Sequence, residues 1–439
     1  MGKTYDFSTQ SAESKTDTAG AIKEILSGRE LVSRIKHQID TNYFYPLKLS
    51  DFAIAYHINP NYLSELFNRQ VGSNFVKYLT MTRIEKAKQY LRNTGFSTET
   101  IADLIGYNDR GYFSRIFSEY CHSRPSEYRR EFRMQTSRFR EEYVYVAIFR
   151  NDPLMIEQDM YGLQLFAMEN NVKAIIEAPA ELDIEFGIHI FDDVINRHPA
   201  GIMVCAYDPA YIDCINKAIR KGIPTITVDC DVPTSNRIAT VSSNWNTIGE
   251  TLADELASSL HECGKVAVLD MSVSTNMKTA YAAFRKTMDK YPNINVLGEY
   301  DDYGNVAVAE QIIKDLLREH PDLAGITGFD SRSAIGACSA IRKAGLRGQV
   351  KVTSVDMTSA HLSLLRDGYI DVLLGQKRAL FTYYGGKLLY QCNHSQLEIS
   401  KHMRGKNIYN VPSFIDTGLI KITRDNLDEM FEPSISMLV

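Results

Sequence analysis

The stretch ITVDCD, residues 226–231, places a thiol between two carboxylates at the end of an apolar, β-branched run. Such a group could coordinate a metal ion, act as a reactive cysteine, or form the polar edge of a pocket beyond a strand. A metal site needs further ligands, and none follows at a recognisable spacing. A reactive thiol needs a basic neighbour, whereas Cys230 is flanked by Asp229 and Asp231. The pattern favours a pocket edge, and neither a metal nor a cofactor is predicted.

The elements that would hold this edge are strands that alternate with helices over residues 143–439. The apolar, strand-like runs are YVYVAIF, VKAIIEA, AGIMVCA, PTITVD, KVAVLD, AGITGF, VKVTSVD and DVLLG. Helical stretches such as Gln158–Asn170 and Asn305–Glu319 separate them. Regular alternation of this kind predicts parallel sheets of the doubly wound type. Ligands of such sheets lie beyond the carboxyl ends of the strands, which is where Asp229 stands.

The preceding segment, residues 28–133, has helical periodicity throughout. Two parts of it, LKLSDFAIAYHINPNYLSELFNRQVG (47–72) and STETIADLIGYNDRGYFSRIFSEYCHSRPSEYR (97–129), each read as a short helix, a turn and a second helix. Between them, MTRIEKAKQYLRNTGFS (81–97) predicts one amphipathic connecting helix. We therefore expect an all-α domain with two helix-turn-helix units.

This double unit resembles the DNA-binding domain of the AraC-type regulators. Arg83 and Ala87 in the connecting helix, IADLIGYND, YFSRIF and the P-S-E-Y-R of 125–129 follow in order at the family's spacing. His57 and His122 depart from it by replacing glycines, with expected effects on local turns only. The resemblance implies that each second helix enters the major groove of double-stranded DNA.

Base-reading candidates are the exposed residues near the start of each second helix. Arginine can pair with guanine, asparagine with adenine, and glutamate with cytosine. For any single side chain, a solvated helix face or a phosphate contact stays an open alternative. The candidates are Asn61, Ser64, Glu65 and Arg69 in the first unit, and Arg110, Gly111, Ser114 and Arg115 in the second.

The alternating segment resembles ribose-type periplasmic sugar-binding proteins and the effector domains of LacI-type repressors. The motifs include FRNDPLM, GIPTITVDCDVP, GFDSRSAIGACSAIRKAGL and VTSVDMTSAHLSLLRDGYIDVLLGQ. The expected architecture is therefore an all-α double helix-turn-helix domain followed by a two-lobed α/β, type I periplasmic-binding-protein-like domain. Three crossings, near 242–244, Gln376 and 414–416, would join a first lobe (143–243 and 377–413) to a second (244–376 and 414–439).

The same resemblance implies a ligand cleft in which Asp229 accepts hydrogen bonds from sugar hydroxyls. For Asp and Asn at such junctions, capping a loop or helix is the open alternative. Cys230 stands where ribose-type proteins have arginine, so ribose bound in the usual manner is not expected. Phe149, Trp245 or Phe329 could supply an aromatic face, with burial in the core as the alternative. The ligand-binding candidates are Asn151, Asp152, Asp229, Asn244, Lys278, Asp330, Asp356 and Gln376.

Composition and charge limit the kinds of partner and the cellular location that the chain can have. Residues 28–133 hold 16 Lys and Arg against 11 Asp and Glu, while residues 134–439 hold 30 against 39, so only the helical domain suits a polyanion. Residues 1–27 read as a flexible, polar segment without a secretory signal, and 134–142 as a linker. No apolar run reaches membrane-spanning length. The seven scattered cysteines read as ordinary buried thiols, and we expect a cytoplasmic protein.

The predicted function is that of a ligand-responsive, sequence-specific DNA-binding transcription regulator. A small sugar or polyol would be the effector, a homodimer the working form, and RNA polymerase a further candidate partner. An enzyme is disfavoured because no G-x-S-x-G, G-x-x-x-x-G-K-[ST] or H-E-x-x-H motif is present. A transport protein is disfavoured by the DNA-binding resemblance. A regulator whose second domain only dimerises or binds a protein partner stays an open alternative.

Overall fold

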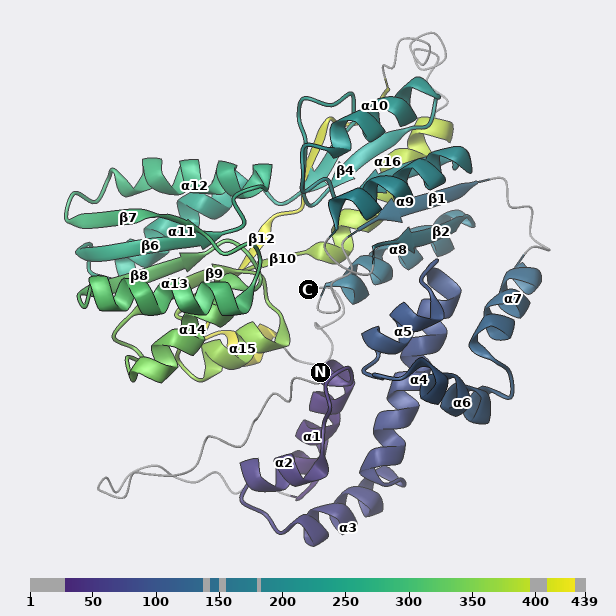
Figure 1. The fold of residues 1–439 in the computed structure, drawn as a ribbon, viewed down its shortest axis with the longest axis horizontal. Coiled ribbons are helices and arrows are strands. Elements are labelled where there is room, and N and C mark those ends of the chain that lie inside the picture. Colours follow the sequence, from purple (N-terminus) through teal and green to yellow (C-terminus); the bar gives the residue numbers. More distant parts are fainter. Residues whose placement is uncertain (1–27, 137–142, 150–154, 180–182, 395–408, 431–439) are drawn as a thin grey trace. The chain divides into compact units, whose positions relative to one another are not determined.

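The computed structural model describes residues 28–136, 143–149, 155–179, 183–394 and 409–430. The chain forms two compact units, one built mainly from residues up to Arg138 and one mainly from those after it (Figure 1). No helix among the described residues is long and apolar enough to cross a membrane. Each unit is described by itself below.

The first unit is all-helical, as predicted, and contains an internal repeat. Helices α3 and α6 each have 12 residues and begin after a capping side chain. Asn59 Oδ1 accepts from the backbone N–H of Asn61 at 2.9 Å, and Asp109 Oδ1 from that of Tyr112 at 2.7 Å. The helices are α1 (Gly28–Asn42), α2 (Leu49–Ala55), α3 (Pro60–Val71), α4 (Phe75–Asn93), α5 (Thr98–Leu104), α6 (Arg110–Cys121) and α7 (Pro125–Thr136).

The connecting helix α4 starts six residues before the predicted 81–97 and ends four residues earlier. Local capping explains both shifts. Asn74 Oδ1 accepts from the N–H of Lys77 at 2.8 Å, which caps the start of α4. Ser97 Oγ accepts from the N–H of Thr100 at 2.9 Å, so Ser97 begins α5 instead of continuing α4.

The two histidines that replace family glycines keep glycine-like backbone. His57 and His122 both have φ of 55°, in the left-handed region that side chains with a Cβ disfavour. His122 ends α6 with its N–H bonded to the carbonyl of Ser118, as Gly72 ends α3 with its N–H bonded to Asn68. The turns are therefore preserved at a cost in backbone strain.

The second unit contains two six-stranded sheets. The first has the order β11-β5-β4-β3-β1-β2 and is parallel throughout. Its strands are β1 (Val144–Ile148), β2 (Lys173–Glu177), β3 (Gly201–Val204), β4 (Thr225–Val228), β5 (Thr240–Ser242) and β11 (Phe414–Asp416). Helices α8 (Ile156–Asn170) and α16 (Arg378–His394) pack together on it, as do α9 (Ile184–Asn196) and α10 (Tyr211–Arg220).

The second sheet has the order β12-β10-β9-β8-β6-β7, and only β12 is antiparallel to its neighbour. Its strands are β6 (Gly264–Asp270), β7 (Ile294–Asp301), β8 (Leu323–Gly328), β9 (Lys351–Val355), β10 (Val372–Gln376) and β12 (Leu419–Thr423). Its helices are α11 (Trp245–Ser259), α12 (Thr275–Met288), α13 (Val306–Glu319), α14 (Ser333–Ala344), α15 (Ser359–Arg366) and α18 (Leu427–Met430).

Alternation along β6 divides the apolar core of this sheet into two layers. Val266 and Val268 pack with α11 and α12, whereas Ala267 and Leu269 pack with α13 and α14. The doubly wound prediction is therefore confirmed, with helices on both faces of the sheet (Figure 1).

Three further details of the prediction were wrong. The linker was predicted to begin at residue 134, but helix α7 continues to Thr136. Residues 414–416 were assigned to the second lobe, but β11 pairs in parallel with β5 of the first sheet, so the third crossing follows Asp416. The cysteines are not uniformly buried, because Cys263 is exposed and Cys121 is half-buried.

Candidate functional site

The candidate DNA-contacting residues lie on α3 and α6 of the helical unit. All eight are exposed except Ser114, which is half-buried. On the opposite side of these helices, Leu63 and Phe67 of α3 and Phe113 and Phe117 of α6 are buried. Each helix therefore has one face in the core and one face that can enter a groove.

Sequence reasoning missed two tyrosines on this surface. Tyr62 and Tyr112 occupy the third position of α3 and α6, and their side chains are 54% and 47% exposed. The guanidinium of Arg115 lies over the Tyr112 ring, 5.2 Å from its centroid. The shared position of the two aromatic residues in the repeat was the signal that could have identified them.

Arg83, a residue of the AraC-type pattern, holds the two halves of the helical unit together from α4. Its Nε donates to the carbonyl of Tyr43 at 2.7 Å and its Nη2 to that of Tyr45 at 2.8 Å. Its guanidinium also lies 5.1 Å from the centroid of Tyr107, which follows α5. Burial lowers the pKa of Arg83, and the nearby tyrosines Tyr107 and Tyr112 oppose that effect.

In the α/β unit, Asp229 directly follows β4 and is 4% exposed. Its φ of 64° turns the chain sharply at the strand end. The backbone is held on both sides, because its N–H bonds to Val241 at 3.0 Å and its carbonyl accepts from Ser242 Oγ at 2.6 Å. Oδ1 has no hydrogen-bond partner in the described structure. A buried carboxylate oxygen in this state is suited to accept a ligand's hydrogen bond.

The other oxygen of Asp229 is held by Arg378, which sequence reasoning missed. Arg378 Nη1 donates to Asp229 Oδ2 and its Nη2 to Asp159 Oδ2, both at 2.9 Å. All three side chains are almost wholly buried. Burial alone would lower the pKa of Arg378, but the surrounding carboxylates outweigh it and raise that pKa well above its ordinary value. Arg378 is therefore a permanent cation beneath the strand end.

Asp356 and Gln376 form a second buried pair. Gln376 Nε2 donates to Asp356 Oδ1 at 2.9 Å, and Gln376 Oε1 has no partner in the described structure. Burial raises the pKa of Asp356 to about 6, although Arg378 and Gln376 act in the opposite direction. The charges of Asp229 and Asp330 act on Asp356 as well, which brings these three predicted carboxylates into one electrostatic environment.

The remaining predicted ligand residues are placed differently. Asn244 Oδ1 caps α11 by accepting from Asn246 and Thr247, and Asp330 Oδ1 accepts from the N–H of Arg332. Both therefore have the capping role that was the open alternative. Lys278 is exposed on α12. Asn151 and Asp152 lie outside the described residues.

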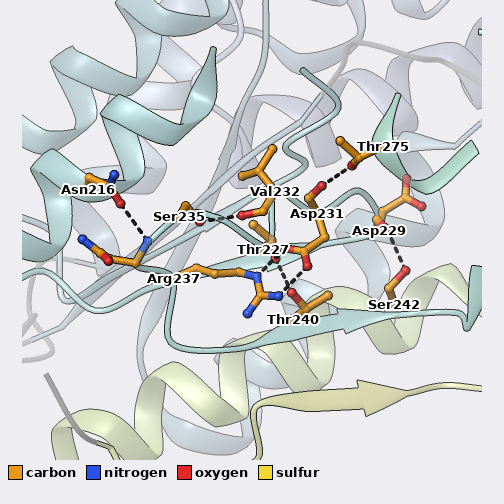
Figure 2. Close-up of polar contacts among 11 residues, drawn as sticks. Asn216, Thr227, Asp229, Asp231, Val232, Ser235, Arg237, Thr240, Ser242 and Thr275 are labelled. Carbon is orange, nitrogen blue, oxygen red and sulfur yellow. Dashed lines mark hydrogen bonds and ion pairs between the residues drawn. The ribbon is translucent and has the colours of Figure 1, made fainter. Parts of the chain in front are cut away.

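Asp231, the second carboxylate of the ITVDCD stretch, has a structural role. Asp231 accepts from both Nε and Nη2 of Arg237 and from Thr227 Oγ1 (Figure 2). Thr275, at the start of α12, donates to the backbone carbonyl of Asp231 and so joins the second lobe to this loop (Figure 2). Asp229 and Asp231 therefore have different roles, although they are two residues apart.

Three further buried polar groups lie near the crossings, and no pattern in the sequence predicted these polar atoms as part of the site. Ser243 Oγ, Trp245 Nε1 and Thr417 Oγ1 are buried and lack partners in the described structure. Trp245 packs in the core layer with α12, and Phe329 is fully buried with its ring 6.0 Å from that of Phe284. Phe329 is therefore a core residue, which was the alternative to a role as an aromatic face for the ligand.

A double helix-turn-helix unit joined to a two-lobed α/β unit with polar groups at its strand ends defines a helix-turn-helix protein with a binding-protein-like domain. The chain belongs to the periplasmic binding protein domain family, whose model matches residues 143–393. A helix-turn-helix domain model matches residues 52–131. The two family resemblances are confirmed. Both kinds of family are normally non-enzymatic.

Similar proteins divide between the two units. The uncharacterized HTH-type transcriptional regulator YijO of Escherichia coli (strain K12) is 37% identical over 105 residues, which cover 24% of this chain and 37% of the regulator. The D-ribose/D-allose-binding protein of Pseudomonas aeruginosa is 26% identical over 212 residues, covering 46% of this chain and 66% of that protein. The chain thus spans about a third of the first relative's length and just under two thirds of the second's.

Solved structures resemble the α/β unit over their whole length. A sugar-binding protein of a Bacillus halodurans sugar ABC transporter has a TM-score of 0.60 and 26% identity, covering 66% of this chain and 100% of its own. The arabinose-binding protein AraP of Geobacillus stearothermophilus has a TM-score of 0.58 and 27% identity, covering 66% and 99%.

Proposed function

We propose that this protein is a ligand-responsive, sequence-specific transcription regulator of the cytoplasm, without catalytic activity. A small sugar or polyol binds between the lobes of the α/β unit and alters DNA binding or activation by the helical unit. The working form is a homodimer, because two DNA readers on neighbouring sites raise each other's effective concentration. RNA polymerase is the partner through which activation would act.

The observation that carries the proposal is the pair of unsatisfied, buried acceptors Asp229 Oδ1 and Gln376 Oε1. Leaving such groups without partners costs roughly 1–3 kcal/mol each, and ligand hydroxyls would remove that cost. Asp229 follows a strand of the first sheet and Gln376 ends a strand of the second. A ligand that bonds to both would therefore favour closure of the lobes.

The similar proteins support the chemistry of the ligand. The relatives and solved structures named for the α/β unit bind ribose, allose, arabinose or other sugars by their names. Asp229 and Gln376 provide the carboxylate and amide groups that suit hydroxylated ligands. The aspartate is paired with Arg378, so only one of its oxygens is available to a sugar.

Two measurements on the full chain test the proposal. Selection from a random double-stranded DNA pool would identify the operator. A thermal-shift screen would then cover pentoses, hexoses, polyols and their phosphates, and a true effector should raise the melting temperature of the protein. The effector should also change operator affinity by the same factor by which the operator changes effector affinity. Operator binding without a response to any of these compounds would instead favour a second domain that only dimerises or binds a protein partner.

The coupling between the units is proposed to run through residues 129–145. A flexible Gly/Ser spacer inserted at 136–140 should leave both operator affinity and effector affinity intact but remove the effect of one on the other. An inserted rigid helical spacer of equal length is the matched comparison. Full regulation retained with the flexible spacer would contradict this route.

A further inference from the structure

Two thiols lie beside the Asp229 carboxylate at the carboxyl ends of neighbouring strands. Cys205 directly follows β3, and Cys230 comes two residues after β4. Because β3 and β4 pair in parallel, with Val204 opposite Thr227, their carboxyl ends meet. One ligand atom from each of Cys205, Asp229 and Cys230 lies within 4.8 Å of the others. All three residues are buried.

The contacts of these groups are compatible with ligation. The thiol of Cys205 lies 3.8 Å from Asp229 Oδ2, and Arg378 holds that same oxygen, which leaves Oδ1 available. Asn276 Nδ2 donates to Cys230 Sγ at 3.4 Å, so this sulfur acts as a hydrogen-bond acceptor. Arg378 and Asn276 thus each hydrogen-bond to one of the three groups, as outer partners do in metal sites.

We propose that Cys205, Asp229 and Cys230 form a binding site for a thiophilic divalent cation of the zinc class. Two sulfurs and one carboxylate oxygen are a donor set that such ions prefer. Tetrahedral zinc–thiolate bonds of about 2.3 Å place two sulfurs roughly 3.8 Å apart. The two sulfurs lie within 4.8 Å of each other, so a shift of no more than about an ångström suffices. Three protein ligands leave a fourth position for water or a hydroxyl of the effector.

Charge balance is consistent with this site despite the nearby arginine. Binding the ion releases the two thiol protons to solvent, so two protons leave as a doubly charged cation enters. The net charge of the buried group is then unchanged, and the Arg378 cation keeps its carboxylate partners Asp159 and Asp229. No charge is therefore left uncompensated in the interior.

This inference rests on the proposed function and changes its contacts at Asp229. With the ion bound to Oδ1, a hydroxyl of the effector would bind at the ion's fourth position instead of at that oxygen. The cation site is tested on the full chain, freed of metal by a chelator and kept reduced with a phosphine. Titration with Co²⁺ should give one ion per chain with the charge-transfer absorption of two cobalt–thiolate bonds, and Zn²⁺ should displace it. Cys205→Ser and Cys230→Ser should each halve that absorption and weaken binding by more than the roughly 10- to 100-fold typical of lost outer partners.

Cys214→Ser is the matched control, because Cys214 is buried on α10 and is not part of the three-residue cluster. It should keep the full absorption. Wild-type protein without the thiolate band overturns the proposal, whether or not the variants fold. An unchanged band in both cluster variants also overturns it. So does a Cys205–Cys230 disulfide that forms in air while reduced protein binds no metal.

The thermal-shift screen with sugars is run separately on the metal-free, reduced protein and again with Zn²⁺. Sugar stabilisation without a cobalt–thiolate band rejects the cation site alone and retains the sugar-responsive function. A band that responds to the two cysteine variants, with no sugar effect in either condition, supports the cation site and rejects the sugar effector. The two proposals therefore fail separately.

Discussion

Arg378 and Asp229 form a buried ion pair, with Nη1 of the arginine 2.9 Å from Oδ2 of the aspartate, although 149 residues separate them in the chain. Arg378 begins α16, immediately after the second crossing, and also binds Asp159 on α8. The Asp229 carboxylate is thereby tied to the two helices that pack together on the first sheet. The pair fixes Asp229 in place while leaving one oxygen for other partners.

Replacing Arg378 with methionine should destabilise the α/β unit by about 3–5 kcal/mol, because Asp159 and Asp229 would be left buried without their cation. Urea unfolding monitored by Trp245 fluorescence measures this loss of stability, since the chain's single tryptophan lies in the α/β unit. Lys377→Met removes the same charge from the half-buried neighbouring residue and should cost little. Equal losses of stability in the two variants would show that the buried ion pair does not contribute more to stability than an exposed charge does.

Asp229→Asn should weaken effector binding roughly 10- to 150-fold, because it replaces a charged hydrogen-bond acceptor worth about 1.5–3 kcal/mol. The dissociation constant of the effector found by the screen is the measurement. Asp231→Asn is the control, since Asp231 is bonded to Arg237 and Thr227. An effector that binds Asp229→Asn as tightly as wild type does not use this carboxylate.

Arg115→Ala should weaken binding to the selected operator by about 1–3 kcal/mol and relax specificity at one base position. Operator affinities measured over a range of salt distinguish base contact from phosphate contact, because loss of a phosphate contact lowers affinity on all sequences and reduces the salt slope by about one. Arg124→Ala removes the same charge from an exposed residue beyond the other end of α6. Unchanged affinity of Arg115→Ala at physiological salt would remove Arg115 from the DNA-reading set.

His122→Gly should stabilise the helical unit by about 0.5–1 kcal/mol, because glycine adopts the left-handed backbone without the Cβ clash and loses part of that gain to unfolded-state entropy. Gly72→Ala at the equivalent position, where φ is 76°, should destabilise it. Far-ultraviolet circular dichroism during urea unfolding follows the helices of both units, whereas Trp245 fluorescence follows the α/β unit alone, so comparing the two transitions reports on the helical unit. Stabilisation by Gly72→Ala would refute the strain argument.

Asp270→Asn should flatten the dependence of stability on pH. Burial, reinforced by the Glu299 carboxylate, raises the pKa of Asp270 from 3.8 to about 9. Between these values the folded state holds a proton that the unfolded state has lost, so stability falls as pH rises, by at most about 1.4 kcal/mol per unit. Trp245 fluorescence in urea at about pH 6 and about pH 8.5 measures the slope. An identical slope in the variant would assign the dependence to another group.

Most regular elements followed from local patterns in the sequence. Eight apolar runs predicted β1, β2, β3, β4, β6, β8, β9 and β10, because strands buried on both faces are nearly continuous in hydrophobicity. The missed strands are β5, β7, β11 and β12, which are short or lie at or near sheet edges, where half-exposed residues dilute that signal. The helix-turn-helix repeat was predictable because its helices bury residues at the spacing of a helical turn.

The sequence by itself determined the type of most elements, the order of the two units and the position of Asp229 at a strand end. These follow from periodicity and capping, which act over a few residues. Only the tertiary structure decided that Arg378 pairs with Asp229 and that Cys205 lies beside Cys230. Parallel strands are joined through helical crossovers, so groups that meet at their carboxyl ends come from distant parts of the chain. The spacing of residues along the chain does not predict these contacts. They form only when the sheets and helices pack together.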